Sequence, residues 1–275
     1  MNRPWHEYTY LVFDIEAAGP LPIGFDLCEI GAITFADGKE KASYQTLLKP
    51  REPMSDFIIG IHGITNEMVA DAPTISEKIR EIHSLFQNSV AVAHHAPFDL
   101  GFMAYEFEKV GLPLPTMPAV CTSLLSRAVI PESKDHKLQT LVQHLGLQGG
   151  QAHRALDDTR ACLQLFLECV RRLGPDVTLE DITKRQGKDL PWNSFSVQTL
   201  RSDPHLSSLV TAIEKKLPVD IIYSGGTYKG QTRRLRPTGI VRNPDGDWFS
   251  AFCEIDKAAK RFYLARVKDV QVVYI

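Results

Sequence analysis

The sequence predicts an α/β protein in which a mixed sheet flanked by helices precedes a small antiparallel β-barrel. Strand-like segments come first in the chain and amphipathic helices follow, a succession typical of helices packed on a sheet. Beyond residue 215 the pattern changes to short β-runs separated by turns. The 275 residues accommodate both parts. We expect one domain at 1–175, a connecting segment at 176–215 and a second domain at 216–275.

The first domain opens with three strand-like segments, at residues 8–14, 27–36 and 42–49. Helical periodicity then predicts a helix over 75–87, with Ile75, Ile79, Ile82 and Phe86 on one face. A short buried strand is expected in "SVAVAHHAPFD". Further helices are predicted at 99–110, 137–145 and 156–173, the last closed by Gly174-Pro175.

The second domain shows five short β-runs divided by turn signals. They are "VDIIYS", "RRLRPTGIVR", "DWFSAFCEI", "KRFYLARV" and "VQVVYI". Between the two domains, "GKDLPWNSFS" has the composition of a linker or a packed loop.

Composition and charge are those of a soluble globular protein, with 44% hydrophobic and 23% charged residues. We see no signal-peptide pattern and no apolar run long enough to cross a bilayer, so we expect a cytoplasmic protein without a membrane partner. Five cysteines without C-x-x-C spacing favour a reducing compartment over a disulfide framework or a zinc site. Residues 1–175 carry 15 basic and 21 acidic residues, a balance of −6, whereas 176–275 carry 16 and 12, a balance of +4.

The first strand carries a close pair of carboxylates. In "YLVFDIEAAG", Asp14 and Glu16 follow four apolar or aromatic residues and point to the same face of the strand. Like charges this close repel unless a proton or a metal ion lies between them. Together with Asp99 and Asp158 they would form an oxygen-rich pocket suited to Mg²⁺ or Mn²⁺. His153, five residues before Asp158, would take the proton from an attacking water.

Each of these residues has a plainer interpretation when taken alone. Asp99 is typical of a helix cap. Asp157 beside Asp158 leaves the choice of ligand open by one residue. The joint occurrence, in this order and in these local contexts, is what favours a site.

The stretches "FDIEAAG", "AHHAPFDLGF" and "HRALDDTRA" resemble the three motifs of the DEDDh 3′–5′ exonuclease family. That family includes the proofreading subunit of the bacterial replicative polymerase, RNase T and oligoribonuclease. The resemblance covers residues 8–172 and extends to "CEIGAITF", "IHGITNEMV" and "KLQTLVQHLGL". It implies an RNase H-like fold and two divalent metal ions held by Asp14, Glu16, Asp99 and Asp158, directly or through water. It also implies His153 as the general base.

The same resemblance implies four positions near the substrate, namely Ala17, His62, His95 and Phe98. Family members commonly have Thr where this chain has Ala17, and Asn where it has His95. These departures bear on substrate preference rather than on the chemistry. A buried structural imidazole is an equal alternative for His95, and we expect His94 to be structural.

The stretch "KGQTRRLRPTGIVR", residues 229–242, contains five basic residues and no acidic one. On a strand, Arg234 and Arg236 share a face while Arg233 points to the other. Arginine forks bind phosphate oxygens in pairs. Aromatic side chains would stack on bases, the candidates being Tyr223, Trp248, Phe249 and Phe262. A solvated basic face and an aromatic core are the alternatives.

Residues 217–275 resemble a WYL domain, an SH3-like β-barrel that binds nucleic acids or nucleotide-like ligands. The tripeptide that names the domain is Trp248-Phe249-Ser250 here, so two of its three letters differ. By position, the residues expected to face a ligand are Tyr223, Arg234, Arg236, Arg261 and Arg266.

The expected protein is a metal-dependent 3′–5′ exonuclease that releases nucleoside 5′-monophosphates from single-stranded 3′ ends of DNA or RNA. A nucleotide-like or nucleic-acid ligand is expected on the barrel. Two alternatives stay open. One is a sensor that binds nucleic-acid ends without cutting them, and the other is a regulator in which the WYL-like domain gates or replaces nuclease activity.

Overall fold

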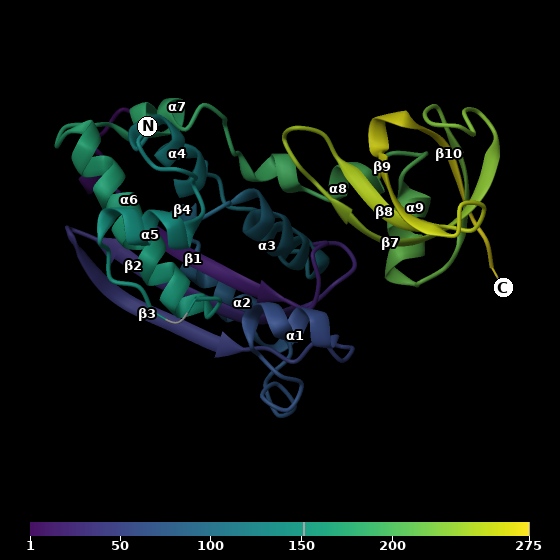
Figure 1. The fold of residues 1–275 in the computed structure, drawn as a ribbon, viewed down its shortest axis with the longest axis horizontal. Helices are drawn as coiled ribbons and strands as arrows, with labels where there is room; N and C mark the ends of the chain where they lie inside the picture. Colours follow the sequence, from purple (N-terminus) through teal and green to yellow (C-terminus); the bar gives the residue numbers. More distant parts are fainter. Residues whose placement is uncertain (151, 275) are drawn as a thin grey trace. The chain divides into compact units, whose positions relative to one another are not determined.

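A computed structural model of the protein describes residues 1–150 and 152–274 (Figure 1). The chain divides into two compact units. Unit 1 comprises Met1–Gly19, Asp26–Leu100 and Leu112–Trp192, and unit 2 comprises Pro20–Phe25, Gly101–Gly111 and the chain from Asn193 onward. Two short pieces of the predicted first domain therefore belong to unit 2.

Unit 1 is built on a five-stranded sheet in the order β3-β2-β1-β4-β5 (Figure 1). Its strands are β1 (Tyr10–Ala17), β2 (Leu27–Ala36), β3 (Lys39–Leu47), β4 (Val90–Ala93) and β5 (Val120–Cys121). The first three are antiparallel neighbours, whereas β4 is parallel to β1 and β5 is parallel to β4. The predicted mixed sheet is confirmed.

Within its described residues, unit 1 contains η1 (Trp5–Glu7) and six complete α-helices. These are α1 (Asp56–His62), α2 (Ile75–Leu85), α4 (Thr122–Val129), α5 (Leu138–Leu145), α6 (Ala155–Leu173) and α7 (Leu179–Arg185). Helix α3 (Pro97–Lys109) begins in unit 1 and continues in unit 2. The bounds predicted for α2, α3, α5 and α6 agree with the structure to within two residues. The sequence did not predict α1, α4 and α7, because helices of seven or eight residues contain too few apolar repeats to show a period.

Alternation along β1 decides which way its carboxylates point. Tyr10 packs on Phe166 of α6, with ring centroids 4.9 Å apart. Phe13 packs on the other side of the sheet, against an aromatic ring that follows α2. Since side chains two residues apart share a face of a strand, Asp14 and Glu16 lie on the α6 side.

Helix α6 approaches the sheet closely because β2 has a glycine at the crossing. A Cβ added at Gly31 would stand 2.4 Å from the backbone nitrogen of Leu156 and 2.5 Å from the carbonyl carbon of Ala155. The Thr159 hydroxyl donates a hydrogen bond to the Gly31 carbonyl oxygen at 3.0 Å. Gly31 is also the ladder partner of Asp14. The contact therefore sets how near α6 comes to the carboxylates of β1.

Unit 2 contains a five-stranded antiparallel sheet in the order β10-β6-β7-β8-β9. Its strands are β6 (Val219–Tyr223), β7 (Thr232–Val241), β8 (Trp248–Cys253), β9 (Ala258–Tyr263) and β10 (Val267–Val272), with η3 (Leu264–Arg266) between the last two. The small antiparallel β domain is confirmed. The predicted closure of this sheet into a barrel is not confirmed, because within the described residues the edge strands β9 and β10 do not pair. Helix α9 (Ser207–Glu214) contacts β7 and β10 and buries apolar surface there without closure.

The segment that the sequence left as a connection is largely helical. It holds α7, η2 (Trp192–Phe195), α8 (Gln198–Arg201) and α9. Helix α9 buries Leu209, Val210 and Ile213 in the core of unit 2. Part of the predicted connection thus serves as core of the second unit.

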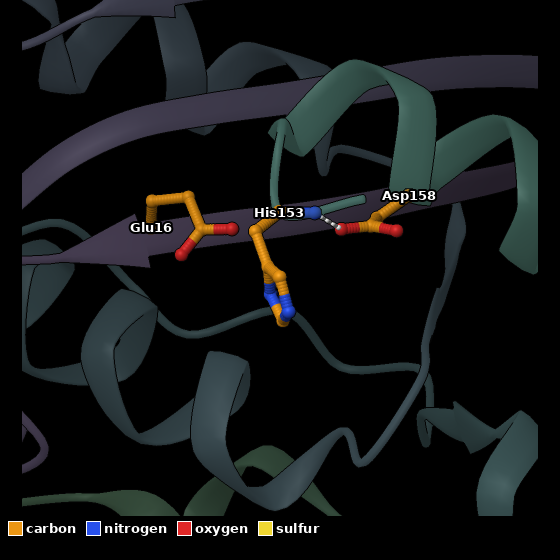
Figure 2. Close-up of side chains that lie close together, drawn as sticks. All are labelled: Glu16, His153 and Asp158. Atoms are coloured by element: carbon orange, nitrogen blue, oxygen red, sulfur yellow. Dashed lines mark hydrogen bonds between the residues drawn. The ribbon is translucent and has the colours of Figure 1, made fainter. Parts of the chain in front are cut away.

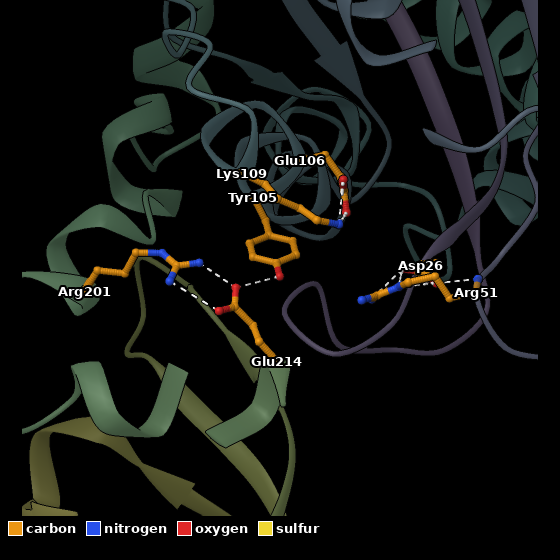
Figure 3. A network of polar contacts seen from close by, with 7 residues as sticks. All are labelled: Asp26, Arg51, Tyr105, Glu106, Lys109, Arg201 and Glu214. Atoms are coloured by element: carbon orange, nitrogen blue, oxygen red, sulfur yellow. Dashed lines mark hydrogen bonds and ion pairs between the residues drawn. The ribbon is translucent and has the colours of Figure 1, made fainter. Parts of the chain in front are cut away.

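The core of unit 2 also draws on earlier segments of the chain. The backbones of Ile23 and Ile240 exchange hydrogen bonds of 3.3 and 2.9 Å. The Tyr105 hydroxyl, on α3, donates to Glu214 at 3.0 Å, and Arg201 donates to the same carboxylate at 3.3 Å (Figure 3). Ile23 and Tyr105 are both buried in the apolar cluster of the β6–β10 sheet. Residues outside 216–275 therefore contribute to this fold.

Among the described residues, no helix combines the length and the apolar character needed to cross a membrane. All five cysteines are buried as free thiols.

Replacing Gly31 tests the approach of α6 to the sheet. We expect Gly31→Ala to destabilise the protein by about 1–3 kcal/mol, since the new methyl group meets backbone atoms that cannot rotate away. Urea unfolding measures the change. Gly60→Ala is the matched control, because Gly60 lies in α1 with open space around it, and we expect a gain of up to about 1 kcal/mol. Wild-type stability in Gly31→Ala would contradict the close crossing.

Candidate active site

A cavity of about 810 Å³ lies where β1 ends and where α3 and α6 begin. Its size is that of a small-molecule or cofactor site. The five residues that the sequence predicted for catalysis and metal binding all line it: Asp14, Glu16, Asp99, His153 and Asp158. Three separate segments of unit 1, namely β1, the start of α3 and the start of α6, thus bring these side chains together.

Asp99 lies in the first turn of α3 and is 2% exposed. One of its carboxylate oxygens accepts a hydrogen bond from the backbone N–H of Ile15 at 3.3 Å. The prediction that Asp99 caps the helix is wrong, because the helix already begins at Pro97. The side chain instead joins α3 to β1 beside Asp14.

Burial and mutual repulsion both disfavour the charged forms in this cluster, and burial is the larger cause. Burial, followed by the charges of Asp99, Glu16 and Asp158, raises the pKa of Asp14 well above its ordinary value. Burial, Asp158 and Glu29 raise the pKa of Glu16 to about 8. Burial also raises the pKa values of Asp99 and Asp158. Four carboxylates whose charged forms are all disfavoured call for a positive counter-charge.

Asp158 and His153 lie at the start of α6. The backbone N–H of His153 donates to Asp158 Oδ2 at 2.7 Å, while the imidazole projects between Asp158 and Glu16 (Figure 2). One ligand atom from each of these three residues lies within 4.8 Å of the others. Asp157 instead pairs with Arg160 at 3.6 Å. Of the two adjacent aspartates, Asp158 is the one in the cavity wall.

Glu29, on β2, is a positioning residue that sequence reasoning missed. It is 0% exposed and accepts hydrogen bonds from Arg154 at 2.8 Å, from the Ala155 backbone N–H at 3.0 Å and from Gln45 at 2.8 Å. Burial alone would raise the pKa of Glu29, but these donors outweigh it and hold the pKa below its ordinary value. A charged carboxylate thus anchors the positive end of α6 and the adjoining His153. The sequence feature that could have identified Glu29 is its place as a glutamate in the middle of an apolar strand.

Two of the four predicted substrate contacts line the cavity and two do not. His95 and Phe98 are in its wall, whereas Ala17 and His62 lie outside it. His95 has a φ of 63°, a left-handed conformation that turns the chain between β4 and α3. The buried His62 ring accepts a hydrogen bond from the backbone N–H of Ile64 at 3.0 Å.

His94 holds two segments of the cavity wall together. Its Nδ1 lies 2.9 Å from the Thr122 hydroxyl, and its Nε2 lies 3.0 Å from the carbonyl oxygen of His136. Because a carbonyl oxygen only accepts, Nε2 is the donor. Burial lowers the pKa of His94 to about 4, which keeps the ring neutral in this role.

The predicted ligand arginines of β7 are largely neutralised. Arg234 and Arg236 share the exposed face of the strand, and Arg233 faces the core, as the alternation predicts. Arg234 binds both oxygens of Asp220, at 2.9 and 2.8 Å. Arg236 pairs with Glu254 at 3.1 Å.

The aromatic side chains of unit 2 belong mainly to its core. Phe249, Phe262 and Tyr223 are buried, so the hypothesis that they form a stacking platform is wrong for these three. Trp248 is partly exposed, and Arg261 already lies over its ring at 3.9 Å. The guanidinium of the predicted Arg266 lies 5.8 Å from a neighbouring tyrosine ring.

Arg233 is a second residue that sequence reasoning passed over. It is 5% exposed, and among the described residues its Nε has no hydrogen-bond partner. Its Nη2 donates to the Gly225 carbonyl oxygen at 3.4 Å. The guanidinium lies 5.1 to 5.7 Å from the ring centroids of Tyr223, Tyr228 and Phe262. Burying a cation with an unused hydrogen-bond donor costs folding free energy. The alternation along β7 was the sequence feature that predicted its inward orientation.

The donor set of the cavity fits hard divalent cations. Carboxylate oxygens are the ligands that Mg²⁺ and Mn²⁺ prefer in proteins. Asp14, Glu16, Asp99 and Asp158 supply them from β1, α3 and α6. A cation there would offset the repulsion that raises the pKa values of these groups.

Curated relatives of this chain are DNA polymerase components. The PolC-type DNA polymerase III of Oceanobacillus iheyensis is 33% identical over 172 residues, which are 62% of this chain and 12% of that protein. A DNA polymerase III subunit epsilon-like protein of Rhodobacter capsulatus is 35% identical over 177 residues, which are 62% of this chain and 25% of that protein. The similarity therefore spans a quarter or less of these relatives.

Solved exonucleases share the fold of unit 1. Exonuclease X in complex with 5′-overhanging duplex DNA superposes with a TM-score of 0.52 and 27% identity, over 65% of this chain and 99% of that one. The nuclease domain of 3′hExo, a DEDDh family member bound to rAMP, superposes with a TM-score of 0.52 and 17% identity, over 63% of this chain and 96% of that one. The second likeness bears on the fold alone.

Two family models match the chain. The WYL domain model covers residues 204–272, which lie in unit 2 and include α9. The RNase_T model, described as exonuclease, covers residues 11–166, more than half of the chain, and includes every acidic residue of the cavity. The chain belongs to this exonuclease family and carries a WYL domain at its C-terminal end.

Proposed function

We propose that the protein is a metal-dependent 3′–5′ exonuclease that hydrolyses the terminal phosphodiester of single-stranded DNA or RNA and releases nucleoside 5′-monophosphates. The observation that carries the proposal is the convergence of Asp14, Glu16, Asp99 and Asp158 on one cavity, beside an imidazole. A protein that only bound nucleic-acid ends would have no use for four mutually repelling carboxylates.

The four carboxylates are proposed to hold two divalent ions, directly or through water. When bound there, Mg²⁺ or Mn²⁺ would polarise the phosphoryl group and lower the pKa of an attacking water. The regular elements that carry the ligands support this role, since β1, α6 and the first turn of α3 all belong to unit 1. Ligands on regular elements keep their spacing when substrate arrives.

His153 is proposed to accept the proton of the attacking water. Its backbone N–H is tied to Asp158, while its exposed imidazole is left at the cavity (Figure 2). Imidazole is the side chain that exchanges protons near neutral pH. Glu29 supports the arrangement by anchoring Arg154 and Ala155, the two residues that follow His153.

The terminal nucleotide is proposed to rest against His95 and Phe98, which line the cavity next to the carboxylates. An aromatic ring gives any base a stacking surface, so this contact favours neither DNA nor RNA. Exonuclease X, solved with duplex DNA carrying a 5′ overhang, supports a nucleic-acid end as the substrate. We propose no substrate contact for Ala17 and His62, which lie outside the cavity wall.

Removing a carboxylate or the metal should stop hydrolysis. We expect Asp14→Asn and Asp158→Asn to abolish release of nucleotides from a labelled single strand, because each removes a proposed metal ligand. EDTA should stop the wild type, and Mg²⁺ or Mn²⁺ should restore it. The melting temperature of metal-free Asp14→Asn should equal or exceed that of wild type, since one repelling charge is gone. Full activity in EDTA would contradict the proposal.

Removing the imidazole should slow the chemical step. We expect His153→Ala to lower kcat by on the order of 10²–10⁴-fold, the usual contribution of a general base. The Mg²⁺ concentration for half-maximal rate should change little. His205→Ala is the control, since His205 is exposed in unit 2, and it should keep the wild-type rate. If His153→Ala hydrolyses the strand at the wild-type rate, a group other than His153 is the general base.

A second candidate function is binding of an anionic ligand by unit 2. Arg233 favours it, because a buried guanidinium with an unused Nε–H is suited to a ligand with phosphate oxygens. Arg266 lies beside it, since a Cβ at Gly225 would stand 3.2 Å from Arg266 Nη1. Such a ligand would make the protein a gated nuclease.

Calorimetric titration with ATP, in EDTA so that no metal is bound, tests this second function. We expect Arg266→Gln to weaken binding, because it removes a cation next to Arg233 while leaving the buried core intact. Arg236→Gln should bind as wild type does, because Arg236 is already paired with Glu254. If the two variants bind ATP equally well, the Arg233 cluster is not the ligand site.

A further inference from the structure

Besides its carboxylates, the lining of the cavity includes three basic side chains, which we call the basic wall. Arg127, near the end of α4, and Lys134 and Lys137, in the loop between α4 and α5, all line it. The three side chains are exposed. Within residues 1–150 and 152–274, none of them forms an ion pair. Their nearest charged neighbour in the loop is Asp135, whose carboxylate accepts the Lys137 backbone N–H at 3.0 Å.

The loop that carries the two lysines is held firmly. The Ser126 hydroxyl of α4 bonds His136 Nδ1 at 3.0 Å. The carbonyl oxygen of His136 accepts from His94 at 3.0 Å, and the Ser133 hydroxyl donates to the Asp135 carbonyl oxygen at 2.6 Å. Since His94 directly precedes the turn into α3, these bonds fix the basic wall relative to Asp99 and the other carboxylates.

These cations differ from the exposed arginines of unit 2. Arg234 and Arg236 are paired with acidic side chains, which cancels much of their attraction for a polyanion. Arg127, Lys134 and Lys137 keep their charge, although residues 1–175 as a whole are acidic. Among the described residues, three cations without an ion pair therefore lie in the wall of a cavity in the acidic part of the chain.

We propose that Arg127, Lys134 and Lys137 form a phosphate-binding subsite for the strand that enters the cavity, on the 5′ side of the nucleotide being removed. The inference rests on the proposed function and adds the residues that hold the substrate. The 3′ nucleotide is consumed at the carboxylates, so every remaining phosphate lies toward the 5′ end. Those phosphates need cations close to an acidic site, and the basic wall supplies them.

The subsite is tested by the salt dependence of binding. The probe is a fluorescent ten-nucleotide single strand, and its anisotropy is measured in EDTA, where no hydrolysis occurs. The variants are Arg127→Gln, Lys134→Gln, Lys137→Gln and the triple variant. Each lost phosphate contact should flatten the slope of log affinity against log salt by about 0.7, so the triple variant should lose about 2. Lys137→Arg should keep the wild-type slope.

Matched controls are Arg80→Gln on α2 and Lys39→Gln on β3, exposed cations outside the cavity wall, and both should bind as wild type does. With Mg²⁺, the triple variant should show a raised KM for the strand and an unchanged kcat. It should hydrolyse the nitrophenyl ester of thymidine 5′-monophosphate, which has one phosphate, at the wild-type rate.

The outcomes separate the subsite from the proposed function. If the triple variant binds the strand with wild-type affinity and slope, the subsite is refuted, while hydrolysis by wild type would leave the exonuclease intact. If wild type hydrolyses neither substrate, the exonuclease proposal fails, and the anisotropy series still decides whether the basic wall binds phosphates.

Discussion

The repulsion among four carboxylates at the end of β1 is the constraint on which the rest of unit 1 depends. Asp14 and Glu16 share a face of the strand by simple alternation, and Asp99 and Asp158 are brought to the same cavity by two helices. Burial disfavours each charged form, and neighbouring carboxylates of the cluster add to the effect at Asp14, Glu16 and Asp99. Contacts outside the cluster must offset the free-energy cost of burying these carboxylates together. Gly31 lets α6 approach the sheet, and Glu29 binds the start of that helix.

Glu29 shows how a buried charge serves the site without touching the substrate. It is the ladder partner of Glu16, yet its pKa lies below the ordinary value, whereas the pKa of Glu16 is raised. The difference lies in the donors. Glu29 accepts from Arg154, Gln45 and the Ala155 backbone, whereas the carboxylates of the cavity face one another. Glu29 is therefore structural, whereas the charged form of Glu16 needs a cation nearby to be stabilised.

The two units use their positive charge differently. In unit 2 the exposed arginines of β7 are neutralised by Asp220 and Glu254, and the buried Arg233 keeps an unused donor. In unit 1, as far as the structure describes the chain, Arg127, Lys134 and Lys137 line the cavity without an ion pair, in a part of the chain whose net charge is negative. Net charge over a domain thus says little about where a polyanion would bind. The local pairing of each cation decides it.

The sequence by itself predicted the mixed sheet and the long helices, because strand alternation and helical period are local properties of the chain. The gathering of Asp14, Glu16, Asp99 and Asp158 was predicted from their motifs and from the family resemblance that these motifs carry. The sequence also identified the basic stretch of β7 and the face on which each arginine lies. Tertiary structure alone decided the pairing of those arginines and the open rather than closed sheet of unit 2. It also decided that segments near Ile23 and Tyr105 join the core of unit 2. These outcomes depend on residues far apart in the chain, whose contacts no local period encodes.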